Sequence, residues 1–269
     1  MTAPAKINLA LVVGPARPDG KHELLTVFQR VDLADTLELE PADELLIDGF
    51  GGDTIVRAAL KALAGAAAVE PRWRVRIEKR IPLAAGLAGG SSDAATALRL
   101  ANATLPQPLP HAKLHELARA LGADVAFFLD DGPQLGSGDG SALDPLDLPQ
   151  DYAVLLLLPH GATKPSTGAV YADFDARAGA DGFAARAAEL RQALAAVRTP
   201  RDLAALPPND LASSPLAAEL RAAGAFRADV SGAGPTLYGL FDDRAAAVAA
   251  AGRLEALGRT WIAAPAWYV

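Results

Sequence analysis

Polar and apolar residues alternate near the start of the chain, over residues 6–13, which read KINLALVV. A period of two predicts a β-strand in which Lys6 and Asn8 share one face with Ala10 and Val12, while the residues between them form the other face. We interpret the segment as a strand rather than a secretory signal, because Asn8 interrupts the apolar run and only Lys6 precedes it. The strand is therefore expected to present a lysine and an asparagine side by side.

The next stretch has the pattern of a turn followed by sheet. Residues 14–22, GPARPDGKH, are rich in glycine and proline, and residues 23–33 and 35–41 have the composition of strands. We predict a turn-rich connection and then two strands that are joined at Ala34 and Asp35.

Helical and strand periods follow one another in the middle of the chain. A helix is predicted from about residue 53 to 68, because apolar side chains recur there at helical spacing: Ile55, Ala59, Ala62 and Leu63. Residues 72–80 return to a period of two, with an apolar and a basic face: Trp73, Val75 and Ile77 against Arg72, Arg74 and Arg76. Another helix is predicted over residues 111–122.

Composition and charge narrow the classes of function. The 269 residues, about half of them apolar, fit a soluble globular enzyme with one large domain or two modest ones. The absence of cysteine excludes disulfides, cysteine-based zinc sites and a cysteine nucleophile, and it fits a cytoplasmic protein. The formal net charge of −7 disfavours nucleic acid and anionic membranes as partners, and the longest apolar run, residues 152–159, is too short to span a membrane. Local features must therefore hold any phosphate group.

Residues 81–98, IPLAAGLAGGSSDAATAL, have the composition of an anion-binding loop that opens a helix. Small residues before Ser91 let backbone N–H groups approach an anion, and Ser91 or Ser92 can cap a helix whose N-terminus favours negative charge. The stretch lacks the lysine of a Walker A loop and the glycine spacing of a dinucleotide site. The alternative is an ordinary strand-to-helix turn with a serine cap and Asp93 as a favourable first-turn acid, and this stretch alone favours neither.

Two other segments carry candidate chemistry. Asp124 follows the helix of residues 111–122 and precedes an apolar run that should be buried, so it is a helix cap, the commoner role at such a place, or a catalytic base. Residues 229–241, DVSGAGPTLYGLF, place a glycine-rich turn between two β-prone runs, which alone indicates a hairpin or a bulge. Neither segment is decisive by itself.

In this order the segments resemble the three motifs of the GHMP kinase superfamily: PAKINL at residues 4–9, PLAAGLAGGSSDAA at 82–95 and SGAGPT at 231–236. DGKHELLTVFQ at residues 19–29 and GADVAFF at 122–128 extend the likeness to nearly the whole chain. The resemblance implies an α+β fold of two lobes, an N-terminal ribosomal-S5-like lobe and a C-terminal ferredoxin-like lobe, with ATP and substrate between them. We expect the lobes to be residues 1–148 and 149–269, divided at a proline-rich stretch.

The resemblance also implies the ATP site and a catalytic pair. The glycine-rich loop of such kinases wraps the phosphates of ATP, magnesium bridges phosphate oxygens, and a lysine and an aspartate, here Lys6 and Asp124, lie at the acceptor hydroxyl. Lys6 then supplies a positive charge that the loop lacks, and Asp124 accepts the proton of the hydroxyl. Ser91 or Ser92 is a candidate contact to the magnesium. The expected ATP-binding residues are Lys79, Pro82, Leu83, Ala84, Ala85, Gly86, Leu87, Ala88, Gly89, Gly90, Ser91 and Ser92.

On the acceptor side the resemblance implies a pocket for a cytidine-containing substrate. His22 is expected to meet the cytosine ring, Tyr171 to stack on it, and Thr167 to lie near the substrate phosphates. Asn8, beside Lys6 on the first strand, and Lys21 are also expected at the substrate.

The chain departs from the superfamily's pattern at four positions. Lys21 stands where relatives usually have a tyrosine, Thr54 where an asparagine is often found near adenine, and Ala84 and Ala85 where glycines are common. A lysine can still cover a ring with its apolar stem. These departures affect the two base pockets more than they affect phosphoryl transfer.

We therefore expect an ATP- and Mg²⁺-dependent kinase that phosphorylates the tertiary C2 hydroxyl of 4-diphosphocytidyl-2-C-methylerythritol, in non-mevalonate isoprenoid biosynthesis. A homoserine or mevalonate type of kinase is the alternative among enzymes. A non-catalytic S5-like binding protein, for example for RNA, is the alternative of another class, although the acidic balance of the chain argues against it. A monomer or homodimer is expected, and the spacing of His111, His115 and His160 predicts no metal site.

Overall fold

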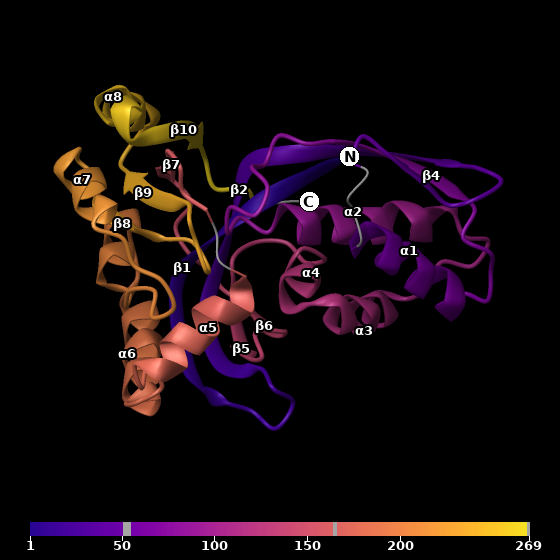
Figure 1. Cartoon of the computed structure of the whole chain (residues 1–269), viewed down its shortest axis with the longest axis horizontal. Helices are drawn as coiled ribbons and strands as arrows, with labels where there is room; N and C mark the ends of the chain where they lie inside the picture. Colours follow the sequence, from indigo (N-terminus) through magenta and orange to yellow (C-terminus); the bar gives the residue numbers. More distant parts are fainter. Residues whose placement is uncertain (51–54, 164–165, 268–269) are drawn as a thin grey trace.

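The computed structural model describes residues 1–50, 55–163 and 166–267. They form two halves, seen side by side in Figure 1: helices α1 to α4 lie along a sheet of amino-terminal strands, and helices α7 and α8 lie against a second sheet. The long strands β1 (Thr2–Ala16) and β2 (His22–Pro41) run from one half toward the other. This architecture of two α+β lobes confirms the predicted fold class.

The first sheet has the strand order β3-β4-β2-β5-β6, and β1 also pairs with β2. Residues 23–41 form the single strand β2 where two strands were predicted, because the irregularity near Ala34 is a shift of register against β1 and does not break the strand. The other strands are β3 (Leu46–Asp48), β4 (Trp73–Glu78), β5 (Gln134–Gly138) and β6 (Ala142–Pro145). The two faces predicted for the segment that forms β4 are confirmed, because its apolar side chains are buried and Arg76 is exposed.

Strand β1 does not keep the simple alternation predicted for residues 6–13. Its register against β2 shifts between Asn8 and Ala10, which marks a β-bulge. One core cluster contains residues from both of the predicted faces: Ile7, Leu9, Ala10 and Val12. The placement of Ala10 and Val12 on the face of Lys6 and Asn8 is therefore wrong. Beyond the bulge it is Leu11 that shares a cleft with Lys6.

The helices of the first half share one core with β2 and β4. They are α1 (Ile55–Ala66), α2 (Gly89–Thr104), α3 (His111–Leu121) and α4 (Ala123–Phe127). The helices predicted over residues 53–68 and 111–122 are confirmed as α1 and α3, while residues 53 and 54 lie outside the described part of the chain.

The second sheet has the order β10-β7-β9-β8. Its strands are β7 (Ala153–Pro159), β8 (Arg227–Val230), β9 (Leu237–Phe241) and β10 (Gly258–Ala263). Of the hairpin or bulge indicated for residues 229–241, the structure has the hairpin, formed by the antiparallel pair β8 and β9. The helical segments of this half are α5 (Thr167–Ala176), α6 (Phe183–Ala196), η1 (Pro200–Ala205), α7 (Leu216–Ala222), α8 (Arg244–Leu254) and η2 (Glu255–Leu257). No helix among the described residues is long and apolar enough to cross a membrane.

Candidate active site

A buried lysine lies at the centre of the cleft between the two halves. Lys6 is 4% exposed, and its Nζ donates a 2.6 Å hydrogen bond to Oδ1 of Asn8. The amide of Asn8 in turn donates to the hydroxyl of Thr26 at 2.8 Å, and that hydroxyl donates to the Ala10 carbonyl oxygen. This chain of hydrogen bonds crosses from β1 to β2 beside the bulge and fixes the direction of the ammonium group.

Asp124 reaches the same lysine from the first half. Its Oδ1 lies 3.6 Å from Nζ of Lys6, and its side chain is 36% exposed. Asp124 is the second residue of α4, whose N-cap is Gly122, and no side chain caps this helix. Burial of the following run, Val125 to Leu129, holds α4 in place. The helix-cap reading of Asp124 is therefore wrong, and the structure pairs the carboxylate with an ammonium at a solvent-accessible cleft.

The glycine-rich loop enters α2 differently from the prediction. The helix begins at Gly89, and its N-cap is Ala88, which has a left-handed backbone (φ 56°) and no side-chain hydrogen bond. Ser91 and Ser92 therefore lie inside the first turn and do not cap the helix. The two serines also differ, because Ser91 lines the cleft whereas Ser92 is fully buried and its Oγ has no hydrogen-bond partner among the described residues.

The turn between β8 and β9 packs directly against the glycine-rich loop. The Ser231 hydroxyl donates to the carbonyl oxygen of Gly86 at 3.0 Å, and the Thr236 N–H donates to the Ala85 carbonyl oxygen at 3.2 Å. A Cβ on Gly232 would lie 3.5 Å from both the Lys6 Nζ and the Asn8 Oδ1. The three sequence motifs, far apart along the chain, therefore meet at one place.

Asn209 fixes the position of the turn between β8 and β9. It was not among the site residues predicted from the sequence motifs. Its amide donates to the carbonyl oxygens of Val230 and Gly232, at 3.0 and 2.7 Å. Its side-chain oxygen accepts from the Leu211 N–H. The surrounding sequence, PPNDL at residues 207–211, does not indicate which atoms the asparagine would hold.

A second lysine, Lys79, is partly buried and precedes the loop in the chain. Nζ of Lys79 lies 2.5 Å from a carboxylate oxygen of Asp35 and 2.6 Å from one of Asp93, and both aspartates are fully buried. Asp35 also accepts from the backbone N–H groups of Arg80 and Ile81, so it holds the start of the loop. Asp93 is a partner of this lysine and not the first-turn acid considered above.

Burial and charge act in opposite directions in this cluster. Burial raises the pKa of the Asp93 carboxyl to about 7, although the Lys79 ammonium acts to lower it. For Lys79, burial lowers the pKa, but the hydrogen bonds to Asp35 and Asp93 outweigh burial and the pKa is raised. The ammonium therefore stays charged at neutral pH at the edge of the cleft, which it lines.

Two of the expected acceptor residues, Thr167 and Tyr171, line the same cleft, and a third, His22, packs on Tyr171. His22 and Tyr171 stack on each other, with ring centroids 4.6 Å apart and planes 27° apart. Nε2 of His22 lies 2.8 Å from a carboxylate oxygen of Asp175, which fixes the ring. Burial, and then the charge of Asp124, raises the pKa of Tyr171 to about 12. Thr167, the first residue of α5, is exposed and lines the cleft beside Tyr171.

Lys21 lies at the rim and has a partner that the sequence did not reveal. Its Nζ is 2.5 Å from a carboxylate oxygen of Asp139, and its side chain is 54% exposed. Burial acts to raise the pKa of Asp139, but hydrogen bonds from Lys21 and Ser141 outweigh it and lower that pKa to about 2. Asp139 lines the cleft, so the departure at Lys21 brings an ion pair to its edge. Thr54, the departure expected near adenine, lies outside the described residues.

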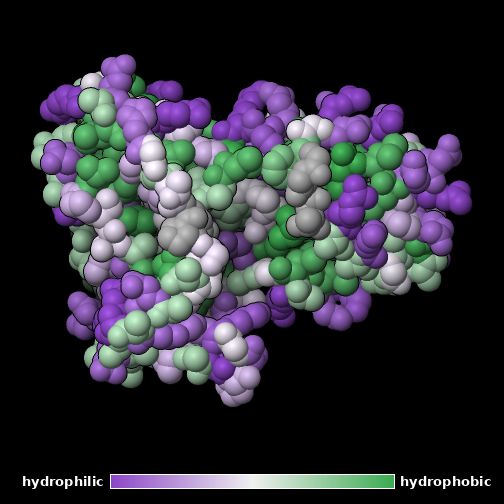
Figure 2. Space-filling view, viewed as in Figure 1, coloured by the Kyte–Doolittle hydropathy of each residue, from purple (hydrophilic) through white to green (hydrophobic). Residues whose placement is uncertain are grey.

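The cleft that joins these groups has a volume of about 490 Å³. Figure 2 shows a hollow between the two halves of the molecule, where polar and apolar surfaces meet. Of the residues predicted from the sequence, Leu87, Ser92, Lys21 and His22 do not line it. Those that do line it are Lys6, Asn8, Lys79, Pro82, Leu83, Ala84, Ala85, Gly86, Ala88, Gly89, Gly90, Ser91, Asp124, Thr167 and Tyr171.

Two family profiles match the chain. The profile for the GHMP kinases N terminal domain matches residues 53–132, and the profile for the GHMP kinases C terminal domain matches residues 185–260. The first includes the glycine-rich loop and Asp124, and the second includes the SGAGPT turn.

Full-length relatives are similar over almost the whole chain. The 4-diphosphocytidyl-2-C-methyl-D-erythritol kinase of Salinispora arenicola is 40% identical, with 94% of this chain and 87% of that protein covered. The kinase of the same name from Geobacter sulfurreducens is 36% identical, with 98% and 96% covered.

Solved structures give the same likeness in three dimensions. A crystal structure of 4-(cytidine 5'-diphospho)-2C-methyl-D-erythritol kinase superposes with a TM-score of 0.79 at 34% identity and covers 99% of this chain and 98% of its own. A mevalonate kinase superposes with a TM-score of 0.77, covering 100% and 99%, but at 12% identity this likeness concerns the fold alone.

Proposed function

The chain belongs to the GHMP kinase family and is an ATP-dependent phosphotransferase that acts on an alcohol, and we propose that this alcohol is the C2 hydroxyl of 4-diphosphocytidyl-2-C-methyl-D-erythritol. The observation that carries the proposal is that the Lys6–Asp124 pair lines one cleft together with the glycine-rich loop and with Tyr171, on which the ring of His22 stacks. Relatives that are 36–40% identical over most of the chain carry the name of this kinase.

In the proposed reaction Asp124 accepts the proton of the attacking hydroxyl. Lys6 lies beside the carboxylate and, already fixed by Asn8, offsets the negative charge that gathers on the transferred phosphoryl group. The N–H groups at the start of α2 and the small residues of the loop hold the ATP phosphates. Positioning of this kind supplies most of the catalysis in phosphoryl transfer.

The cleft also fits a magnesium ion brought with ATP. Mg²⁺ prefers oxygen ligands and usually keeps several waters besides phosphate oxygens. Ser91 presents a hydroxyl at the cleft and is a candidate ligand. The Oγ of the neighbouring Ser92 is buried without a partner among the described residues, and it would reach the ion only after its side chain rotates toward the cleft. When bound, the ion would neutralise charge on the phosphates, whereas Asp35 and Asp93 are engaged by Lys79.

Three further expectations belong to this proposal. We place the boundary between the lobes at residues 148 and 149, where the last strand of the first sheet has ended and β7 has not begun. We expect a cytoplasmic enzyme that works as a monomer or a homodimer, with a small molecule and not nucleic acid as its partner.

An assay of ATP consumption over a panel of acceptors tests the proposed function. We expect turnover with 4-diphosphocytidyl-2-C-methyl-D-erythritol and little with mevalonate or homoserine, because the pocket beside Tyr171 suits a base. Turnover with mevalonate or homoserine alone would contradict the proposed identity of the acceptor, but the protein would still be a kinase of this family. Binding of RNA without any ATP turnover would favour the non-catalytic alternative.

Replacing Ser91 by alanine is expected to raise the KM for MgATP several-fold, because a hydroxyl facing the phosphates or the metal is lost. The double replacement Ser91→Ala, Ser92→Ala should raise it further while the protein stays folded. Steady-state kinetics at varied MgATP measure both effects, with Ser137→Ala on β5 as the control. An unchanged KM for MgATP in the double variant would mean that the two serines do not take part in nucleotide binding and that the loop is only a structural turn.

Replacing His22 by alanine is expected to weaken binding of the cytidine substrate, because Tyr171 loses a stacked ring and Asp175 loses its partner. Lys21→Tyr should retain or improve that binding, since it adds a ring at the rim of the cleft. The KM for the acceptor, measured at saturating ATP, reports both changes, and the KM for ATP is the internal control. Equal acceptor KM values for the parent and His22→Ala would contradict a base pocket beside Tyr171.

A further inference from the structure

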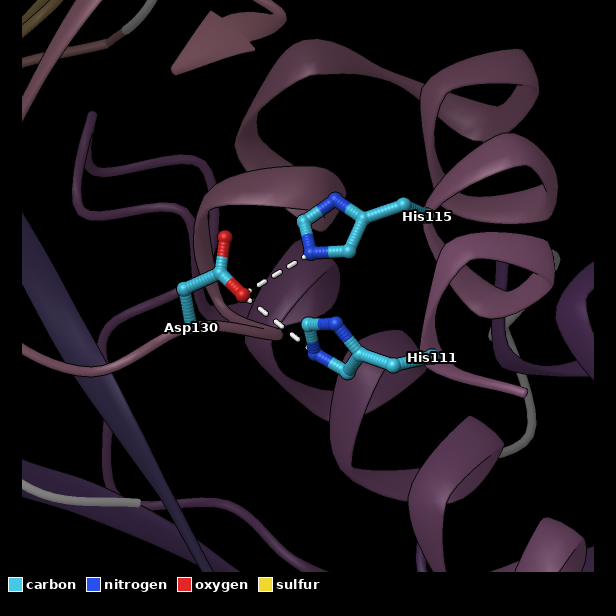
Figure 3. A group of neighbouring side chains, drawn as sticks. All are labelled: His111, His115 and Asp130. Carbon is cyan, nitrogen blue, oxygen red and sulfur yellow. Dashed lines mark hydrogen bonds and ion pairs between the residues drawn. The ribbon is translucent and has the colours of Figure 1, made fainter. Parts of the chain in front are cut away.

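Two histidines and an aspartate converge on the outer side of the first half, away from the cleft residues. His111 and His115 lie one turn apart on α3, and Asp130 follows the end of α4 (Figure 3). The Asp130 Oδ1 lies 3.3 Å from the His111 Nε2 and 2.9 Å from the His115 Nε2. Spacing along the sequence did not predict this cluster, because its third member comes from another segment.

We propose that His111, His115 and Asp130 form a site for one divalent transition-metal ion of the zinc type. One nitrogen of each ring and one carboxylate oxygen lie within 4.8 Å of one another. A tetrahedral ion with bonds of about 2.0–2.2 Å needs ligand atoms roughly 3.4 Å apart. The two separations from Asp130, 3.3 and 2.9 Å, are close to that value, so rotations of the side chains would admit the ion, and water would complete its coordination.

The chemistry of the ligands selects the class of ion. Imidazole nitrogen suits zinc, copper, nickel and cobalt, whereas magnesium and calcium prefer oxygen. Histidines at positions i and i+4 of a helix face the same side and are a common pair of zinc ligands. The carboxylate adds a negative charge that favours any cation at this point.

The cluster is partly organised before an ion binds. The backbone oxygen of Asp130 accepts a hydrogen bond from the guanidinium of Arg30, which is fully buried and also donates to the Phe127 carbonyl oxygen at 2.8 Å. His115 is 9% exposed, so its ring has little freedom, and the contact with Arg30 holds the backbone of Asp130. His111 has a side chain that is 62% exposed and can move to meet the ion.

One feature limits the affinity. Nδ1 of His115 is buried and has no hydrogen-bond partner among the described residues. When Nε2 binds a metal, Nδ1 carries the ring proton, and in most sites a carbonyl or carboxylate accepts it. Loss of such outer contacts weakens binding by about 10–100-fold. We therefore expect micromolar rather than nanomolar affinity for Zn²⁺.

Titration of the tag-free, chelator-stripped protein with ZnCl₂ in the absence of nucleotide tests the proposal. We expect one equivalent of Zn²⁺ to bind, no competition from Mg²⁺, and visible d–d absorption when Co²⁺ is used instead. His111→Ala should weaken Zn²⁺ binding at least tenfold, and Asp130→Asn should weaken it as well. His160→Ala removes an exposed histidine from the end of β7 and serves as the matched control, which should bind Zn²⁺ as the parent does.

Folding of the variants is followed separately. His111 is exposed, so His111→Ala should keep the melting temperature of the metal-free parent, and Zn²⁺ should raise the melting temperature of the parent but not of this variant. Absence of saturable Zn²⁺ binding by the parent would overturn the proposal. Parent-like Zn²⁺ binding by His111→Ala would overturn it as well. The cluster would then serve only to join α3 to the segment after α4 by hydrogen bonds.

Discussion

Replacing Asp124 by asparagine is expected to remove nearly all phosphoryl transfer and to leave the binding of ATP and acceptor within a few-fold of the parent. The asparagine keeps the size of the side chain, and no side-chain cap is lost because none closes the start of α4. It cannot accept the proton of the attacking hydroxyl, nor hold a negative charge 3.6 Å from the Lys6 ammonium. An interaction realised mainly in the transition state should lower kcat by a factor on the order of 10² or more with KM little changed.

Single-turnover measurements at saturating MgATP and acceptor separate the chemical step from binding. Circular dichroism checks the fold, and Asp131→Asn is the control, since it removes an exposed carboxylate a few residues further along the same segment. A variant that keeps more than about a tenth of the parent's single-turnover rate would lack the expected general-base contribution. Asp124 would then be a group that orients Lys6 and not the base.

The elements that the sequence predicted well are those whose signal is local. A period of two over residues 72–80 became β4, and helical spacing became α1 and α3, because burial of one face determines each pattern. The bulge in β1 could not be predicted in this way. It depends on how two long strands pair, and a shift of one residue reverses every face that follows.

The candidate site shows the same division. The resemblance to the GHMP kinases predicted that Lys6 and Asp124 act together, although they lie far apart in the sequence. Neither periodicity nor spacing could predict this pair. The partners of the charged groups remained hidden, because Asp35, Asp93 and Asp139 are separated from their lysines by between 14 and 118 positions. Such pairs are formed by the tertiary fold, and a single sequence carries no signal that joins them.

The contact between the two glycine-rich segments is also tertiary, and it explains why Gly86 is a glycine. Its backbone is left-handed, at φ +81°, and a Cβ there would lie 2.4 Å from the Ser231 carbonyl oxygen and 2.9 Å from that of Gly234. Both atoms are backbone, so they cannot rotate away as a flexible side chain could. Nearby Ala84, which stands where the superfamily often has a glycine, also has a left-handed backbone, with φ 53°. This conformation is strained for alanine because of its Cβ, whereas glycine adopts it freely.

Replacing Gly86 by alanine is therefore expected to force the two loops apart and to displace the phosphate-binding backbone from Lys6. We expect kcat/KM for ATP to fall by a factor on the order of 10², since a misplacement of about 1 Å costs that much in an oriented site. The matched control is Gly161→Ala, which has a similar backbone (φ +68°) but nothing within 4 Å of its Cβ, so it carries the backbone strain without the clash. Urea unfolding should show Gly86→Ala to be less stable than Gly161→Ala by about 1–3 kcal/mol. Equal stability and equal ATP kinetics in the two variants would mean that the loops separate at no cost, and that their contact does not position the site.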